Sequence, residues 1–148
     1  MEKLLTVSVA AYNGAATLQK ALESCLVADE SLQALLDVII IDDMISSGDS
    51  IIEVATELKR RKAKRIFAAA TFGLFTNGLA KFDAAYEQGI IDHILTTNLV
   101  YQRPELLSRP YYVNVDLSKY IALLIDNLNH NVSIHGLLNP TDRINRIL

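Results

Sequence analysis

Four β-branched residues follow one another from Val38 to Ile41, and this run restricts the possible folds more than any other feature. A strand with apolar side chains on both faces is typical of the centre of a parallel sheet, where both faces are buried. Neighbouring parallel strands must be joined by long crossover connections, which are usually helices. The run therefore predicts a fold in which strands and helices alternate.

Apolar runs and helical spacings do alternate along the sequence. Strands are expected at Leu4–Ala10, Leu36–Ile41, Arg65–Ala70, Ile90–Leu95 and Tyr111–Val115. Helices are expected where apolar residues recur every three or four positions, at Ala15–Val27, Ser50–Lys62, Leu79–Glu87 and Leu117–Asn129. The tail Val132–Leu148 is expected to hold one or two short helices broken near Pro140, and Asp116 to cap the helix before it.

This order of elements predicts an α/β fold, a three-layer αβα domain with a mostly parallel five-stranded sheet, over residues 1–148 as a single domain. The strand Leu36–Ile41 is expected beside both Leu4–Ala10 and Arg65–Ala70, with right-handed crossovers. Sites in such sheets lie at the carboxyl ends of the strands, near a switch in strand order. The longest loop is expected at Asn98–Pro110.

Composition excludes several classes of protein. The chain has 148 residues, is 51% hydrophobic and carries a formal net charge of −3, which argues against disorder and against general nucleic-acid binding. No apolar run is long enough to cross a membrane, and the first residues do not have the pattern of a signal peptide. The single cysteine, Cys25, excludes an internal disulfide and is expected in a cytoplasmic protein.

One segment, IIIDDMISSGDS at residues 39–50, gathers the residues that point to a site. Gly48 lets the backbone approach a phosphate without a Cβ in the way, and the start of the following helix favours an anion. Ser46, Ser47 and Ser50 add hydroxyl donors. The carboxylates Asp42 and Asp43 are placed to accept ribose hydroxyls or to hold a hydrated divalent cation. The segment predicts a sugar-phosphate site, and the alternative is an acidic turn with a Ser-capped helix.

This segment resembles the phosphoribosyl-diphosphate (PRPP) binding signature of type I phosphoribosyltransferases. Over residues 37–148, including Ile66–Thr76, Ile91–Thr97 and the tail Val115–Leu148, the sequence resembles the C-terminal half of ribose-phosphate pyrophosphokinases, or PRPP synthetases. The resemblance implies a phosphoribosyltransferase-like fold and a role in nucleotide biosynthesis. It also implies ribose-5-phosphate or PRPP as the ligand, Mg2+ as cofactor, and assembly into a homo-oligomer.

By the same resemblance, Asp42 and Asp43 would face the ribose 2′- and 3′-hydroxyls and bind the metal through water, and Ser46–Ser50 would hold the 5-phosphate. The loop departs from the family at Asp49, since synthetases usually carry Thr and Gly near its end. A carboxylate repels a phosphate unless it points away, so we expect Asp49 to point away or to cap the helix. Thr71-Phe72-Gly73 stands where many synthetases have Thr-His-Gly, so no histidine function is carried over.

Residues 1–43 resemble a different family. The turn at Tyr12-Asn13-Gly14 and the helix with Ser24 and Cys25 are similar to the opening of family 2 glycosyltransferases, although the usual proline is absent. The second strand of that family also ends in an acidic pair, so Leu36–Asp43 fits both families. We therefore interpret the chain as a chimera, engineered or recombined, with a glycosyltransferase-like segment at residues 1–36.

In synthetases the ATP-binding and pyrophosphate-side elements precede the PRPP signature, and nothing upstream of Asp42 matches them. The catalytic residues are therefore left unassigned, and the chain is expected to be a catalytically incomplete binding half. The alternatives are an active ribose-phosphate diphosphokinase or phosphoribosyltransferase, an engineered scaffold without function, and a glycosyltransferase fragment.

Other polar groups are expected to be structural. The basic run Lys59–Arg65 is expected to be the solvated end of a helix, where positive charge complements the dipole. The three histidines, His93, His130 and His135, share no spacing typical of metal ligands.

Overall fold

The computed structural model of the chain describes residues 6–10, 37–139 and 141–145. It divides into two compact units, Met1–Val115 and Asp116–Leu148, and each is described here by itself. Among the described residues, no helix has both the length and the apolar character needed to span a bilayer.

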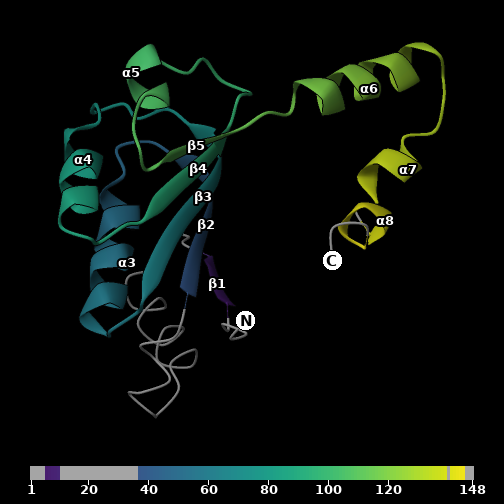
Figure 1. Ribbon diagram of the computed structural model, residues 1–148. Coiled ribbons are helices and arrows are strands. Elements are labelled where there is room, and N and C mark those ends of the chain that lie inside the picture. Colours follow the sequence, from purple (N-terminus) through teal and green to yellow (C-terminus); the bar gives the residue numbers. More distant parts are fainter. Residues whose placement is uncertain (1–5, 11–36, 140, 146–148) are drawn as a thin grey trace. The chain divides into compact units, whose positions relative to one another are not determined.

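The first unit is built on a parallel five-stranded sheet (Figure 1). Its strands stand side by side in chain order: β1 (Thr6–Ala10), β2 (Asp37–Ile45), β3 (Arg65–Gly73), β4 (His93–Thr97) and β5 (Tyr112–Val115). Val38 of β2 lies opposite Val7 on one side and Ile66 on the other. The predicted α/β class, the parallel sheet and the position of β2 between its two neighbours are therefore confirmed.

The helices α3 (Asp49–Arg60), α4 (Ala80–Glu87) and α5 (Pro104–Leu107) connect successive strands and lie on one face of the sheet (Figure 1). Each strand is placed on the same side of its predecessor, so right-handed crossovers bring all these connections to one face. The five strands follow one another in chain order across the sheet, so the strand order contains no reversal. In the described part of this unit the sheet and one helical layer are seen.

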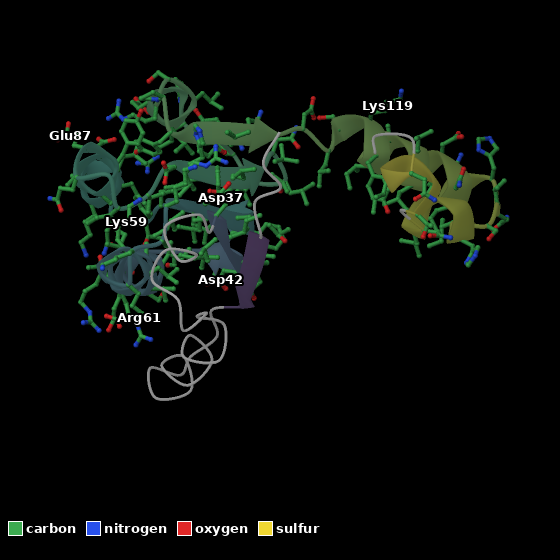
Figure 2. All side chains as sticks on the ribbon, turned by 60° about the horizontal axis from the view of Figure 1, so that its bottom comes forward. Asp37, Asp42, Lys59, Arg61, Glu87 and Lys119 are labelled. Atoms are coloured by element: carbon green, nitrogen blue, oxygen red, sulfur yellow. The ribbon has the colours of Figure 1, made fainter. Side chains whose placement is uncertain are left out.

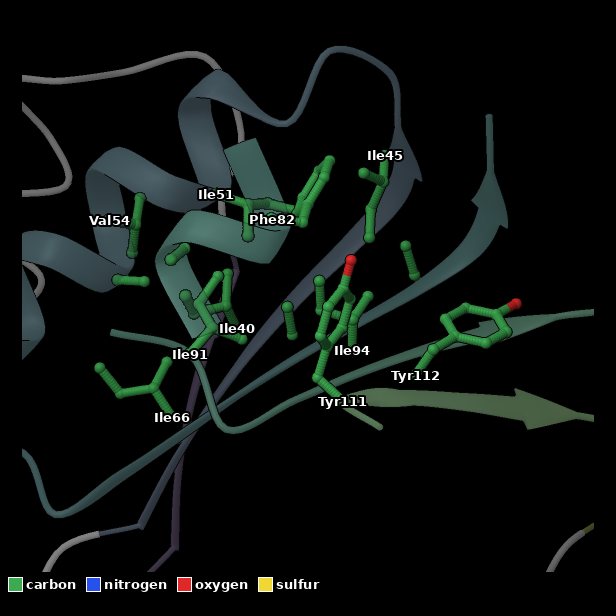
Figure 3. Close-up of a cluster of buried hydrophobic side chains, with 14 of the residues drawn as sticks. Ile40, Ile45, Ile51, Val54, Ile66, Phe82, Ile91, Ile94, Tyr111 and Tyr112 are labelled. Atoms are coloured by element: carbon green, nitrogen blue, oxygen red, sulfur yellow. The ribbon is translucent and has the colours of Figure 1, made fainter. Parts of the chain in front are cut away.

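The hydrophobic core fills the space between the sheet and these helices (Figure 3). Ile40, Ile66 and Ile94 of the three central strands are almost fully buried. Helix α3 packs on them through Ile51, Val54, Ala55 and Leu58. Successive side chains of a strand point to opposite faces, so Ile41, next to Ile40, keeps 46% of its surface exposed.

The strands β2 and β3 are longer than the apolar runs that predicted them. Their pairing continues through Met44 with Phe72 and through Ile45 with Gly73. Asp42 and Asp43 therefore lie within β2 instead of following it. The exposed carboxyl end of a strand tolerates polar side chains as long as the partner strand still supplies backbone hydrogen bonds.

The fourth strand begins later than expected, at His93 instead of Ile90. Gly89 adopts a positive φ of 67°, and the N–H groups of Ile90 and Ile91 donate to Ala85 O at 2.8 and 3.3 Å, which closes α4. Ile91 is 1% exposed, so it completes the core at the end of the helix. Ile90 and Ile91 therefore belong to the end of α4, and their assignment to the strand was wrong.

Two further expectations concern connections. The expected loop Asn98–Pro110 contains the one-turn helix α5, which begins at Pro104 and buries Leu106. The expected helix Ala15–Val27, the turn at residues 12–14 and Cys25 lie outside the described residues.

The second unit holds α6 (Ser118–Asn129), α7 (His135–Leu138) and α8 (Thr141–Ile144). The first corresponds to the helix expected at Leu117–Asn129, and the other two are the short helices expected in the tail Val132–Leu148. Asp116 lies one residue before the N-cap position, which Leu117 occupies, and its carboxylate accepts the Ser118 N–H at 2.8 Å. The Tyr120 hydroxyl donates to Leu137 O at 3.3 Å, which ties α6 to α7.

Candidate functional site

The acidic pair lies near the carboxyl end of β2, where Asp42 is paired with Ala70 of β3 (Figure 2 labels Asp42). Asp42 is half-buried and Asp43 is exposed. The Asp43 N–H donates to Asp42 Oδ1 at 2.8 Å. Burial raises the pKa of the Asp42 carboxyl above its ordinary value, and the adjacent Asp43 carboxyl adds to the rise.

A cation or hydroxyl donors placed at this pair would relieve the repulsion between its carboxylates. Mg2+ is typically held by one or two carboxylates together with water and substrate oxygens. Asp42 and Asp43 therefore fit a hydrated Mg2+. No group of three or more His, Cys, Asp or Glu side chains able to hold a metal occurs in the described part of the chain.

The loop after β2 turns sharply at Gly48, the N-cap residue of α3, whose φ is 82°. A Cβ at this position would lie 2.0 Å from Phe82 Cζ, so both the backbone conformation and the approach of α4 require glycine. Figure 3 shows Phe82 pointing from α4 towards Ile45 and Ile51 on the two sides of this loop. The close approach fixes the start of α3 against α4.

The start of α3 presents backbone donors. The first intrahelical bond runs from the Ile52 N–H to Gly48 O at 3.0 Å. The N–H groups of the preceding helical residues have no acceptor within the helix. Together with the helix dipole, such groups favour an anion. Ser46 and Ser47 lie between β2 and α3, and Ser50 lies in the first turn of α3. Their role in holding a phosphate stays a prediction.

The loop after β3 lies beside this first loop. The N–H groups of Leu74 and Phe75 donate to Ile45 O at 2.9 and 3.2 Å, and the Thr76 N–H donates to Ser46 O at 3.0 Å. The hydroxyls of Ser46 and Thr76 are 3.4 Å apart. The carboxyl ends of β2 and β3 are thus joined into one surface by backbone hydrogen bonds.

Asp49 does not cap α3, because Gly48 occupies the N-cap position and makes no side-chain cap bond. The Asp49 carboxylate instead accepts a hydrogen bond from Ser47 Oγ at 2.8 Å and forms an ion pair with the Lys81 ammonium of α4. The Lys81 contact, followed by the Ser47 hydroxyl, lowers the pKa of Asp49. The expectation of a capping carboxylate is wrong.

Sequence reasoning missed Lys81 and Thr76. Both belong to the segment that follows the third strand, and in a parallel sheet the carboxyl ends of neighbouring strands meet at one edge. Their position just after that strand was the available signal.

The basic run Lys59–Arg65 includes the end of α3, as predicted, but its last residue, Arg65, begins β3. Lys59 and Arg60 are in the last turn of α3, and Lys59 Nζ donates to Lys64 O at 2.7 Å. Arg65 pairs with Asp37 at the amino ends of β3 and β2, the edge opposite the loop.

His93, Tyr111 and Tyr112 make packing contacts within the first unit. The His93 ring stacks on Phe67 with centroids 5.8 Å apart. Tyr111 and Tyr112 are 1% and 9% exposed, and the Tyr112 hydroxyl lies 2.7 Å from Thr96 Oγ1.

Known proteins match the part of the chain that contains this candidate site. The family described as the phosphoribosyl synthetase-associated domain matches residues 26–139, which begins upstream of the predicted boundary at residue 37. The ribose-phosphate pyrophosphokinase of Vibrio cholerae is 30% identical over 103 residues, which cover 70% of this chain and 32% of that protein. The corresponding protein of Haemophilus influenzae is 32% identical over 103 residues, with the same coverage.

A solved structure supports the fold. The phosphoribosylpyrophosphate synthetase from Mycobacterium smegmatis superimposes with a TM-score of 0.62 at 20% identity, over 86% of this chain and 46% of that chain. The match spans about a third of the length of the curated relatives, 32% in each of the two named above. The predicted resemblance to PRPP synthetases is confirmed: the chain is a partial PRPP-synthetase-like region and belongs to the phosphoribosyl synthetase-associated domain family.

Proposed function

We propose that the carboxyl end of β2 binds ribose-5-phosphate, free or as part of PRPP. One observation carries this proposal: in a chain of this family, a carboxylate pair near the carboxyl end of β2 is followed within a few residues by the glycine-centred start of α3. Asp42 and Asp43 would accept the ribose hydroxyls. The loop Ser46–Ser50, with its hydroxyls and helix N–H groups, would hold the 5-phosphate.

Mg2+ is proposed as the cofactor of this site. Asp42 and Asp43 would hold it through water molecules. Its contribution would be positive charge that neutralises the carboxylates and an anionic ligand. Protein residues would still orient the sugar, because hydroxyl and phosphate groups bind at opposite ends of the segment 42–50.

We propose that the 148-residue chain by itself binds this ligand without completing a diphosphoryl transfer. Such a transfer develops negative charge that needs several positioned cations. Among the described residues, Lys81 pairs with Asp49 of the loop and Arg103 donates to Phe75 O of the neighbouring loop at 3.0 Å, whereas α3 has its basic residues Lys59 and Arg60 in its last turn. The alternative, an active transferase, is favoured by the names of the matched relatives, ribose-phosphate pyrophosphokinases.

Two further expectations remain proposals. A second copy of this chain is proposed as a partner, because Ile41, Val113 and Val115 of the sheet stay 37–46% exposed. A glycosyltransferase-like origin of residues 1–36, and hence a chimera, rests on the sequence resemblance.

The binding proposal is tested by thermal and chemical unfolding with ribose-5-phosphate and Mg2+. Ligand at 100 times its dissociation constant should add about 2.7 kcal/mol to the free energy of unfolding. Asp43→Asn should remove this gain, and Glu53→Gln, which makes the same charge change on an exposed position of α3, should keep it. No stabilisation of the unaltered chain would contradict the proposal.

A coupled assay for AMP release from ATP and ribose-5-phosphate separates the two functions. We expect no turnover above background for the chain alone. Turnover that Asp43→Asn abolishes would establish the alternative, an active transferase.

A further inference from the structure

An acidic side chain is built into the loop that we propose for the phosphate. Asp49 is the first residue of α3, and its carboxylate receives the Ser47 hydroxyl at 2.8 Å and the Lys81 ammonium. Two donors that a phosphate at this loop would use thus already contact an oxyanion from the protein. The Asp49 carboxylate thus accepts the hydrogen bonds that we expect a bound phosphate to accept.

The cation of this pair is held near the loop by its neighbour in sequence. Phe82 is 1% exposed, packs edge-to-face on Phe75 with ring centroids 5.1 Å apart, and lies against Gly48. The backbone of Lys81 is therefore fixed beside the start of α3. Only the flexible part of its side chain is free to move between neighbouring anions.

The ion pair between Lys81 and Asp49 is suited to exchange, in which Lys81 leaves the Asp49 carboxylate and binds a phosphate instead. The side chains of Lys81 and Asp49 are 53% and 59% exposed, and exposed ion pairs contribute little to folding stability. Without a ligand, the positive charge of Lys81 and the negative charge of Asp49 cancel. A phosphate monoester carries up to two negative charges and therefore attracts Lys81 more strongly than the single carboxylate does. Displacing the Asp49 carboxylate from Lys81 would leave the core contacts of Phe82 unchanged.

We propose that Lys81 is a phosphate-binding residue of this site and that Asp49 is an internal competitor that the phosphate must displace from Lys81 and Ser47. This inference rests on the proposed function. It makes the affinity of the site depend on a side chain that repels the ligand directly and also occupies its donors. The ligand class is a phosphate monoester of a sugar, and a sugar without phosphate gains nothing from the exchange.

Isothermal titration calorimetry with the full chain, Mg2+ and ribose-5-phosphate tests the exchange. Asp49→Asn should tighten binding about tenfold and Lys81→Gln should weaken it about tenfold, the size of one hydrogen bond between charged groups. Lys81→Arg should restore most of the affinity. The matched controls are Glu87→Gln, at the last residue of α4, and Lys64→Gln, just before β3. Both are exposed charges outside the loop, and each substitution should change the affinity less than about twofold.

Two measurements separate exchange from a general change in charge. Lys81→Gln should cost more affinity in the Asp49→Asn background than in the unaltered chain, because no internal ion pair is then given up. Titration with ribose, which lacks the phosphate, should be insensitive to both substitutions. Inorganic phosphate should show the same order of variants as ribose-5-phosphate.

The outcomes distinguish this inference from the proposed function. Binding that Asp43→Asn abolishes, with Asp49→Asn and Lys81→Gln both within twofold of the unaltered chain, would overturn the exchange and leave the proposed function intact. Strictly additive effects of the two substitutions would also overturn it. Absence of binding in every variant, with the fold retained by circular dichroism, would overturn both.

Discussion

Asp37 and Asp49 each pair with a basic residue, but at opposite ends of β2 and in different surroundings. The side chain of Asp37 is 9% exposed and accepts two hydrogen bonds from Arg65, of which Nε to Oδ1 measures 2.9 Å. Asp49 meets Lys81 on a surface where both side chains are more than half exposed. The Arg65 side chain is 48% exposed, so the two pairs differ in the burial of the carboxylate and in the number of hydrogen bonds. Two-point pairing to a buried carboxylate holds neighbouring strands together, whereas a single contact between exposed groups is free to exchange.

Phe82→Ala should have the largest effect on the free energy of unfolding, because it removes the buried side chain that holds Lys81 near Asp49. Replacing a buried phenylalanine by alanine costs about 3–5 kcal/mol in the free energy of unfolding, measured by urea denaturation. Ribose-5-phosphate affinity should also fall, since α4 no longer holds Lys81 beside the loop. Leu107→Ala, at a side chain that is 50% exposed, is the control and should lose far less stability.

Asp37→Asn should come next and sharpen the contrast between the two pairs. The loss of two charge-assisted hydrogen bonds from a buried carboxylate should cost about 1–2 kcal/mol in unfolding free energy. Ligand affinity should not change, because Arg65 lies at the amino end of β3. If Asp49→Asn destabilised the chain as much as Asp37→Asn, the distinction between the pairs would be wrong.

The pH dependence of stability should report the Asp37 pair. The Arg65 guanidinium is the main cause that lowers the pKa of the Asp37 carboxyl below its ordinary value. The folded state therefore binds this proton less readily than the unfolded chain, whose aspartates titrate near pH 3.9, about the model-peptide value. The stabilisation is complete above that range and is lost as the pH falls through the lowered pKa.

Urea unfolding of the unaltered chain and of Asp37→Asn from neutral pH to about pH 2 measures this. The difference between the two curves should shrink on acidification below about pH 4. A difference that stays constant over the whole range would mean that packing, and not the carboxylate charge, makes Asp37 stabilising.

Lys81→Gln should have the smallest effect on folding. The melting temperature should fall by less than with Asp37→Asn, and the small difference should vanish at about 1 M salt, where the screening length is about 3 Å. A larger, salt-independent loss would show that Lys81 is needed for the fold and would weaken the case for its exchange.

Local patterns predicted the central part of the fold and the position of the candidate site. The β-branched run Val38–Ile41 is buried in β2 because such side chains suit a strand enclosed between layers. The candidate site residues from Asp42 to Ser50 are contiguous, so their order along the chain already places carboxylates, glycine and helix start in succession. Element ends were less predictable, since β2 continues to Ile45 only because β3 is there to pair with it.

By itself, then, the sequence determined the alternation of strands and helices and the composition of the loop, because both depend on neighbours within one turn or a few residues. The tertiary structure decided that Lys81, 32 residues beyond Asp49, contacts its carboxylate, and that α3, α4 and α5 share one face of the sheet. The physical reason is the same for both. Strands that are added in one direction with right-handed crossovers place successive loops side by side at their carboxyl ends. The sequence can indicate which residues follow each strand, but which side chains meet there depends on the strand order and on the packing of the helices.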